Sequence, residues 1–220
     1  MKMTTRLFSS LAIGLAMFGL VVAGTLDPPG PPSPTMATLQ QIYDRLGGPA
    51  GVARTGQTAC WDVAGVSISC GATGQDGALA KGVSVSPRFT DNGNGTVTDH
   101  LTGLTWLKNA NCFGLQTWTA ALSDANTLAS GACGTTDGSV AGTWRLPNVR
   151  ELQSVIDYGQ FNPALPVGHP FAGVLSLHYW SSTSYVSSPN NAWQVDLFYG
   201  GLYVDLKGNA YTVWPVRGGL

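Results

Sequence analysis

The sequence predicts an α+β domain in which two helices accompany a set of short antiparallel strands. Three observations support this prediction: an apolar stripe with helical spacing over residues 117–129, a helix start with a second stripe over residues 148–158, and strand-like alternation after residue 178. Only 10% of the 220 residues are charged, whereas glycine occurs 29 times and proline 13 times. Such a composition is typical of a loop-rich protein with one medium-sized domain and additional segments.

The first 23 residues are typical of a secretory signal peptide. Lys2 and Arg6 precede an apolar run over residues 7–23, which ends at the small residue Ala23 and is short for a membrane span. We therefore expect cleavage near Ala23 and a mature chain that is secreted, periplasmic or at the cell surface, with no membrane span. Cleavage removes two of the 11 basic residues and none of the 12 acidic ones. The mature chain is then mildly acidic and lacks the basic surface that binds nucleic acid.

Residues 24–50 combine a proline-rich spacer with a predicted short helix. The spacer covers residues 27–34 and is typical of a stiff, extended segment. The helix covers residues 35–46 and has one apolar face, formed by Leu39, Ile42, Tyr43 and Leu46. Two interpretations are open. Either this face docks on the domain, or it forms a seam between identical chains and makes the protein a homo-oligomer.

Residues 51–87 are rich in glycine, serine and threonine and predict a hairpin extension. The strand-like residues 59–61 and 66–70 flank a turn at Ala64 and Gly65.

The four cysteines all lie after the predicted signal peptide, which suits an oxidising compartment. Four cysteines allow three pairings, and the sequence alone does not choose among them. We favour the neighbouring pairs Cys60–Cys70 and Cys112–Cys133, each of which would stabilise the fold by ~2–4 kcal/mol. The first pair would join the arms of the hairpin, and the second would bracket the helix at residues 117–129.

The predicted main domain covers residues 88–220 and begins with a compact β unit at residues 88–108. Asn94 and Gly95 are typical of a hairpin turn. Four nearby side chains resemble calcium ligands in type: Asp91, Asn92, Asn94 and Asp99. Their spacing does not fit an EF-hand loop, so we expect no metal site.

The first helix of this domain is predicted from its apolar stripe, formed by Trp118, Ala121, Leu122, Ala125 and Leu128. We place Thr117 as its N-cap, and Ser130 with Gly131 as its end.

The segment over residues 144–152 combines an aromatic anchor with the start of the second helix. Pro147 disfavours helix in the residue before it, and Asn148 is a good N-cap. Glu151 is the only glutamate in the chain and stands where it can complete a capping box, so we expect it to be structural rather than catalytic. Gly159 is expected to end the helix in the left-handed conformation. Two further residues would tie the helix to the element in front of it: Trp144 and Arg145.

The C-terminal part of the chain predicts four strands in an antiparallel meander. The expected strands cover residues 178–183, 192–198, 202–206 and 211–217, and glycine-containing turns separate the last three.

Several motifs occur in the same order as in a known family. They are Arg88-Phe89-Thr90-Asp91, Gly95-Thr96-Val97-Thr98-Asp99, Thr102-Gly103-Leu104, Trp144-Arg145-Leu146-Pro147, Glu151-Leu152, Tyr179-Trp180-Ser181-Ser182-Thr183 and Val216-Arg217. Through these motifs, residues 88–218 resemble the Lcl C-terminal domain family, named after a collagen-like adhesin. The resemblance implies a C-type-lectin-like fold, related to that of the formylglycine-generating enzyme, in which Trp144 and Trp180 are structural. It also implies trimers and binding of glycosaminoglycans, as in the collagen-like adhesins.

We expect a non-catalytic binding or adhesion module for an extracellular glycan or another surface polymer. Flat rings can stack on sugars, and amide or charged groups can bind hydroxyls. The candidate ligand-binding residues are Tyr199, Tyr203, Tyr211, Asn190, Asn191, Asp205 and Lys207. The alternative that these rings pack in the core stays open. An anionic polymer would also need a cationic patch, for which the candidates are Lys108, Arg145, Arg150, Lys207 and Arg217.

The alternative function is a structural surface protein that forms oligomers through residues 35–46. We do not expect an enzyme, because His100, His169 and His178 lack metal-ligand spacing and the cysteines have structural partners. The sequence indicates no cofactor.

Overall fold

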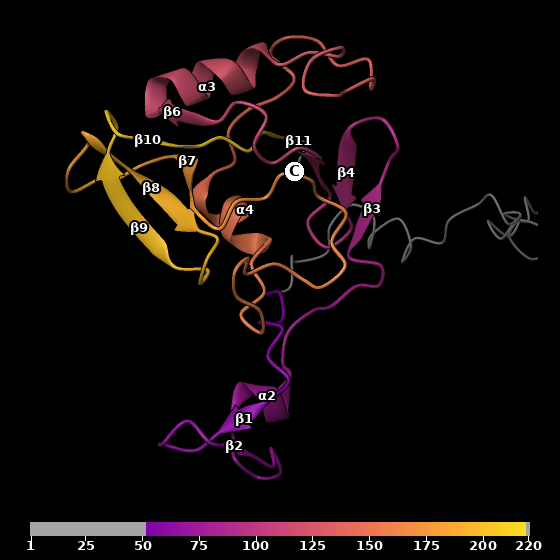
Figure 1. Ribbon diagram of the computed structural model, residues 1–220, viewed down its shortest axis with the longest axis vertical. Coiled ribbons are helices and arrows are strands. Elements are labelled where there is room, and N and C mark those ends of the chain that lie inside the picture. The colour runs from indigo at the N-terminus through magenta and orange to yellow at the C-terminus, as the bar shows by residue number, and fades with distance from the viewer. Residues whose placement is uncertain (1–51, 219–220) are drawn as a thin grey trace, which may run out of the picture. The chain divides into compact units, whose positions relative to one another are not determined.

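The computed structural model describes residues 52–218. The predicted signal peptide at residues 1–23 and the predicted helix at residues 35–46 lie outside the described residues. Within residues 52–218, short strands outnumber the helices, which confirms the α+β class, and most strands belong to two sheets (Figure 1). Over the same range, no helix has the length and apolar character needed to cross a membrane.

The first sheet has four strands in the order β11-β5-β4-β3, and all neighbours are antiparallel. Its strands are β3 (Phe89–Asp91), β4 (Thr96–Asp99), β5 (Leu104–Leu107) and β11 (Val216–Gly218). The β3–β4 turn extends beyond the predicted Asn94-Gly95 pair, because the Asn92 N–H bonds to the Thr96 carbonyl at 3.0 Å. A side chain at Gly95 would collide with the backbone of Gly134, so this turn packs closely on a distant loop.

The second sheet has five strands in the order β6-β10-β7-β8-β9. Its strands are β6 (Leu115–Thr117), β7 (His178–Ser184), β8 (Asn191–Asp196), β9 (Leu202–Leu206) and β10 (Ala210–Thr212). The strands β7, β8 and β9 form an antiparallel meander, as predicted.

The prediction of one closing strand over residues 211–217 is wrong. β10 pairs with β6 and, in parallel, with β7, whereas β11 joins the other sheet beside β5. Pro215 lies between the two strands and has no N–H to donate to a ladder, while its carbonyl accepts the Leu107 N–H at 3.0 Å. The chain therefore crosses from one sheet to the other at Trp214, which is buried in the core that the sheets share.

The first predicted helix is present but slightly shorter than expected. α3 covers Trp118–Thr127 and lies on the β6 and β10 side of the five-stranded sheet (Figure 1). Thr117 occupies its N-cap position, but the Thr117 side chain makes no capping bond. The Trp118 N–H instead bonds to the Lys207 carbonyl at 3.0 Å, so the helix start is held by a distant turn. The predicted end at residues 130–131 lies beyond the observed one.

The second predicted helix is also shorter than expected. α4 covers Val149–Ser154, so the predicted left-handed end at Gly159 is wrong. Beyond the helix, the Tyr158 N–H bonds to the Thr55 carbonyl at 2.6 Å, and the helix does not continue because its next donors have other partners. Glycine is required at position 159 for a different reason: a Cβ there would collide with the Gly56 carbonyl.

The start of α4 is built as the sequence predicts. The Asn148 side chain accepts the N–H groups of Arg150 and Glu151, both at 2.9 Å, and the Glu151 carboxylate accepts the Asn148 N–H at 2.7 Å. Glu151 also accepts two bonds from the Arg145 guanidinium, both at 2.7 Å. These bonds raise the pKa of Arg145. They also fix the helix start to the segment before it.

The core between the two sheets is built from large aromatic side chains. Trp106, Trp144, Tyr179 and Trp214 have no exposed surface and belong to one apolar cluster, which also includes residues of α4. The Trp214 ring centroid lies 5.1 Å from that of Trp106 and 5.7 Å from that of Tyr179. Trp180 belongs to a second cluster, with residues of α3.

Stability is expected to fall at alkaline pH because of the buried Tyr179. Burial raises the pKa of its phenol from 10.0 to about 12, although the Leu175 N–H donated to the phenol oxygen opposes the rise. The unfolded chain loses this proton near pH 10 and the folded protein near pH 12. The stabilisation is therefore complete below pH 10 and is lost between these values, by roughly 2–3 kcal/mol.

Urea denaturation of the wild-type protein and the Tyr179→Phe variant, at about pH 9 and about pH 11.5, measures this loss. The variant should lose less stability than the wild type between the two pH values. Equal losses in the two proteins would contradict the assignment to Tyr179.

Residues 52–87 contain the predicted hairpin and one additional helix. β1 (Cys60–Trp61) pairs with β2 (Ser67–Ile68), and Gly65 has the left-handed conformation in the turn between them. α2 (Asp76–Leu79) is not predicted by the sequence analysis, because a single helical turn shows no apolar periodicity.

Both favoured cysteine pairs form disulfides. The Cα atoms are 5.2 Å apart in the Cys60–Cys70 pair and 5.7 Å apart in the Cys112–Cys133 pair. The first disulfide closes the hairpin of β1 and β2. The second joins the segment after β5 to the loop after α3, so it links the segments that precede and follow this helix.

Candidate functional site

Strand register brings several candidate ligand-binding residues onto one face of the five-stranded sheet. Trp180 on β7 lies opposite Gln194 on β8, and Gln194 lies opposite Tyr203 on β9. Residues directly opposite one another in a sheet point to the same face. Asp205 is two residues from Tyr203 and therefore lies on this face as well.

Aromatic contacts join these strands into one cluster. The His178 ring centroid lies 5.0 Å from that of Tyr203 and 5.6 Å from that of Tyr211 on β10. The Tyr211 ring also packs against Trp180, with 4.9 Å between the ring centroids. We call the following five residues the tyrosine cluster: His178, Gln194, Tyr203, Asp205 and Tyr211.

A hydrogen bond between Tyr211 and Asp205 fixes both side chains on this face. The Tyr211 hydroxyl donates to Asp205 Oδ2, and the Leu206 N–H donates to Asp205 Oδ1 at 2.7 Å. The bond to Asp205 raises the pKa of Tyr211, and burial adds to the rise. The same bond lowers the pKa of Asp205, and the Leu206 N–H lowers it further. At neutral pH, Asp205 is therefore an ionised acceptor and Tyr211 a protonated donor.

Two polar atoms of the tyrosine cluster have no hydrogen-bond partner among residues 52–218. They are Gln194 Oε1 and His178 Nδ1. Gln194 is only 2% exposed. A buried polar atom without a partner costs about 1–3 kcal/mol, a cost that a ligand or an ordered water removes when it bonds to the atom. The cluster thus offers bonding capacity that the protein itself does not use.

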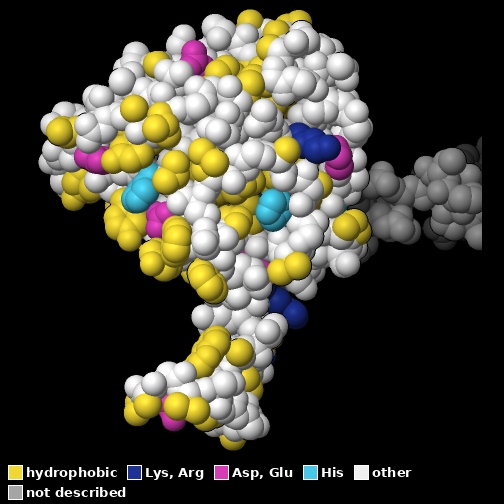
Figure 2. Space-filling view, in the orientation of Figure 1, with side chains coloured by type: hydrophobic (Ala, Val, Ile, Leu, Met, Phe, Trp, Pro, Cys, Tyr) yellow, Lys and Arg dark blue, Asp and Glu magenta, His cyan; other side chains and the backbone are white. Residues whose placement is uncertain are grey.

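The β9 side of the tyrosine cluster is open to solvent. The Tyr203 ring, on the outermost strand β9, is 47% exposed. Figure 2 shows hydrophobic side chains, with histidine and acidic side chains among them, on the side where Figure 1 places β8 and β9. An open ring beside fixed polar groups allows a flat, partly apolar ligand to stack and to be oriented by hydrogen bonds.

Four other candidate ligand-binding residues lie outside the tyrosine cluster. Tyr199 lies in the β8–β9 turn, where its ring packs on Phe198 with 4.4 Å between centroids, and it is 66% exposed. Asn190, Asn191 and Lys207 lie at the other end of the β8–β9 hairpin. Because the ends of such a strand are roughly 17 Å apart, these four residues do not form one compact site.

The Lys207 ammonium group is held by contacts within the protein. Its Nζ donates to Ser184 Oγ at 2.7 Å and to the Pro189 carbonyl at 2.9 Å, and it lies 4.0 Å from the centroid of the Trp118 ring. Lys207 therefore ties the end of β9 to the start of α3, and its charge is not directed at the tyrosine cluster.

Three of the other candidate cations form ion pairs with acidic side chains. Lys108, Arg145 and Arg217 lie 2.6, 2.7 and 3.0 Å from carboxylate oxygens. Arg150 is exposed and has no ion pair in the described part of the chain. These residues therefore do not form the open cationic patch that an anionic polymer requires.

Two members of the tyrosine cluster, His178 and Gln194, are not among the candidate ligand-binding residues proposed from the sequence. His178 stands two residues before Trp180, so strand alternation places both on one face. This signal identifies His178 only once the register with β8 and β9 is known. Between residues 52 and 218, no group of three or more His, Cys, Asp or Glu side chains is placed to hold a metal ion.

Comparison with protein families identifies the family of this chain. The family model described as the Lcl C-terminal domain matches residues 95–217, which is more than half of the chain. This range contains the whole tyrosine cluster, and it agrees with the resemblance seen in the sequence motifs. No curated protein matches the chain.

Proposed function

Since the chain belongs to the Lcl C-terminal domain family, we propose that it is an exported, non-catalytic module that binds a glycan at the tyrosine cluster. One observation carries this proposal: the exposed Tyr203 ring lies on the same face as a fixed carboxylate, Asp205. A sugar ring can stack on the aromatic ring while its hydroxyl groups donate to this acceptor.

The proposed ligand is a neutral glycan rather than an anionic one. Asp205 is ionised and would repel an anion bound at the cluster. Lys207, the nearest of the candidate cations in sequence, has its ammonium group held by Ser184 and Pro189. This charge distribution argues against the glycosaminoglycan binding that the family resemblance implies.

The C-type-lectin-like fold and export are part of the same proposal. The fold is supported by the pairing of α3 and α4 with two sheets, and by the last strand, β11, which returns beside the early strand β5. Export is supported by the two disulfides and by the predicted signal peptide at residues 1–23.

A second candidate function is a structural surface protein that assembles through residues 35–46 and the Cys60–Cys70 hairpin. It is favoured by apolar side chains that the hairpin leaves exposed: Trp61 is 42% exposed, Val66 is 58% exposed and Val63 is fully exposed. A partner in an assembly would cover such side chains. This function requires no ligand at the tyrosine cluster, so the binding experiment that follows distinguishes the two candidates.

A glycan array tests the proposed function. We expect the mature chain to bind neutral glycans equally well with calcium and with a chelator. The Tyr203→Ala variant should lose about tenfold or more in affinity, because it removes the exposed stacking ring at the centre of the site. The Asp205→Asn variant should also bind more weakly, because it replaces a charged acceptor with a neutral one.

The matched control is Tyr185→Ala. The Tyr185 ring packs against Trp193, with 5.5 Å between ring centroids, and Trp193 points away from the face that carries Gln194. We expect its affinity to equal that of the wild type. The proposal fails if no glycan binds, if only sulfated glycans bind, or if the control loses as much affinity as Tyr203→Ala.

A further inference from the structure

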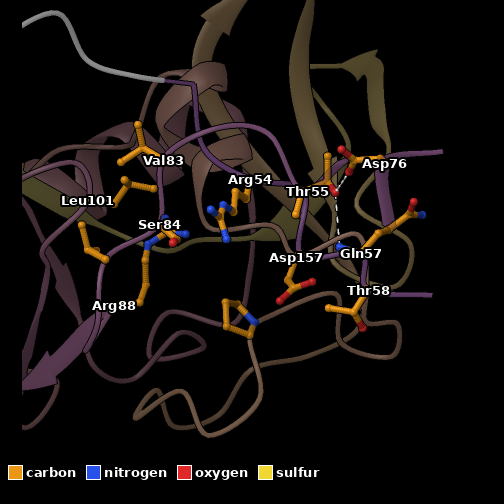
Figure 3. Close-up of a pocket in the computed structure, with 14 residues that line it drawn as sticks. Arg54, Thr55, Gln57, Thr58, Asp76, Val83, Ser84, Arg88, Leu101 and Asp157 are labelled. Atoms are coloured by element: carbon orange, nitrogen blue, oxygen red, sulfur yellow. Dashed lines mark hydrogen bonds between the residues drawn. The ribbon is translucent and has the colours of Figure 1, made fainter. Parts of the chain in front are cut away.

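A second candidate binding site lies in a cavity away from the tyrosine cluster. The cavity has a volume of about 280 Å³ and is lined mainly by residues 54–88, with contributions from Leu101, Asp157 and Pro166 (Figure 3). Most of this lining precedes residue 95 and so lies outside the range that the family model matches. The volume is near the lower end for ligand pockets, which limits the ligand to a small molecule.

Backbone hydrogen bonds hold the walls of the cavity. The Arg54 N–H bonds to the Val83 carbonyl at 3.1 Å, and the Tyr158 N–H bonds to the Thr55 carbonyl at 2.6 Å. A side chain at Gly56 would collide with the Asp157 carboxylate, so the segments that contain these two residues are in close contact. The cavity is therefore a formed feature of the fold.

Arg54 supplies a positive charge that residues 52–218 leave without an ion-pair partner. Its Nε donates to the Gly82 carbonyl at 3.2 Å, and its two terminal nitrogens have no partner among residues 52–218. Arg88 also lines the cavity, but its guanidinium group donates to Asp99 and to the Ser154 carbonyl. Of the two arginines that line the cavity, Arg54 is thus the one whose terminal nitrogens no described residue engages.

Asp157 supplies a negative charge in the same cavity. Its Oδ1 accepts the Gly159 N–H at 2.8 Å, and its Oδ2 has no hydrogen-bond partner in the described chain. Arg54 and Asp157 form no ion pair with one another, and Figure 3 shows them entering the cavity from different segments. Asp76, the other carboxylate in the lining, accepts the Thr55 hydroxyl.

The rest of the wall includes apolar side chains: Ala80, Val83, Val85, Leu101 and Pro166. A ligand that satisfies all parts of the cavity carries an anionic group, a cationic group and a small apolar body. We propose that the cavity binds a small zwitterion of the apolar α-amino acid type, with its carboxylate at Arg54 and its ammonium group at Asp157. Arginine forms bidentate hydrogen bonds with carboxylates, and a free carboxylate oxygen accepts from an ammonium group.

Isothermal titration calorimetry of the mature chain with leucine tests this proposal. Leucinamide lacks the carboxylate and N-acetylleucine lacks the ammonium group, so both should bind about tenfold or more weakly than leucine. The Arg54→Gln variant should lose affinity for leucine but not for leucinamide. The Asp157→Asn variant should lose affinity for leucine but not for N-acetylleucine.

Arg150→Gln and Asp124→Asn are matched controls, because both side chains lie outside the cavity lining and should leave leucine binding unchanged. The comparison of the three ligands on the wild-type chain needs no variant, so it decides the matter even if a variant fails to fold. The proposal is overturned if leucine does not bind at concentrations up to about 10 mM. It is equally overturned if the three compounds bind alike or if leucine binding survives both cavity substitutions.

Discussion

Replacing Trp214 with alanine is expected to lower the free energy of unfolding by about 3–5 kcal/mol. Trp214 has no exposed surface, and its ring centroid lies 4.8 Å from that of Phe171 and 5.1 Å from that of Trp106. Its Nε1–H also donates to the Leu107 carbonyl at 2.8 Å, so the substitution leaves both a large cavity and a buried carbonyl with one bond fewer. Because the chain crosses between the two sheets at this residue, a shift of one sheet alone cannot fill the cavity that the substitution leaves.

Urea denaturation followed by circular dichroism measures this effect. Trp61→Ala is the matched control, because Trp61 is 42% exposed and its loss should change the free energy of unfolding by less than about 1 kcal/mol. A loss below about 1 kcal/mol for Trp214→Ala as well would show that the core does not depend on this ring.

Removal of the Asp99 carboxylate is expected to lower the free energy of unfolding by a similar amount, about 3–5 kcal/mol. The Asp99 side chain is completely buried and accepts two bonds from Arg88, at 2.8 and 3.0 Å. It also accepts the Leu101 N–H at 2.9 Å and the Thr102 hydroxyl at 2.8 Å. In the Asp99→Ala variant the Arg88 side chain, which is only 18% exposed, keeps its charge without a carboxylate partner.

Asp91→Ala is the matched control for this experiment, because it breaks an exposed ion pair. The side chains of Asp91 and Lys108 are 34% and 37% exposed, and such pairs contribute about 0–1 kcal/mol. The double variant Arg88→Met/Asp99→Leu should be more stable than Asp99→Ala, because it leaves no buried charge without a partner. If Asp99→Ala loses no more stability than Asp91→Ala, the buried Arg88–Asp99 pair does not make the expected contribution to the free energy of unfolding.

The parts of the fold that sequence predicts best are those set by neighbouring residues. The cap of α4 depends on Asn148 and Glu151, which stand three residues apart, and the structure confirms it. The end of the same helix depends instead on the Tyr158 bond to Thr55, a residue distant in the chain, and the prediction at Gly159 is wrong. The prediction of one closing strand over residues 211–217 is wrong for the same reason. The chain divides near Pro215 because β10 pairs with β6 and β11 pairs with β5, and both pairings join segments that are distant in the chain.

In the candidate site, too, features set by neighbouring residues can be predicted, whereas features set by contacts between distant segments cannot. Tyr203, Tyr211 and Asp205 can be proposed from composition, but their meeting on one face depends on the register of β8 with β9 and on the return of β10. No feature of the neighbouring sequence distinguishes these three residues from Tyr199 and Lys207, which the structure places outside the tyrosine cluster. The cavity at Arg54 and Asp157 could not be predicted, because its two charges are about a hundred residues apart in sequence.

An NMR titration of the isotopically labelled mature chain with the neutral glycan that binds best on the array tests most directly whether the tyrosine cluster binds glycans. We expect shift changes to centre on the amide and ring signals of His178, Tyr203 and Tyr211, and the signals of residues 52–87 to stay in place. If no neutral glycan shifts these signals, or if the changes fall on the extension while the tyrosine cluster is unaffected, the claim that this face binds glycans is contradicted.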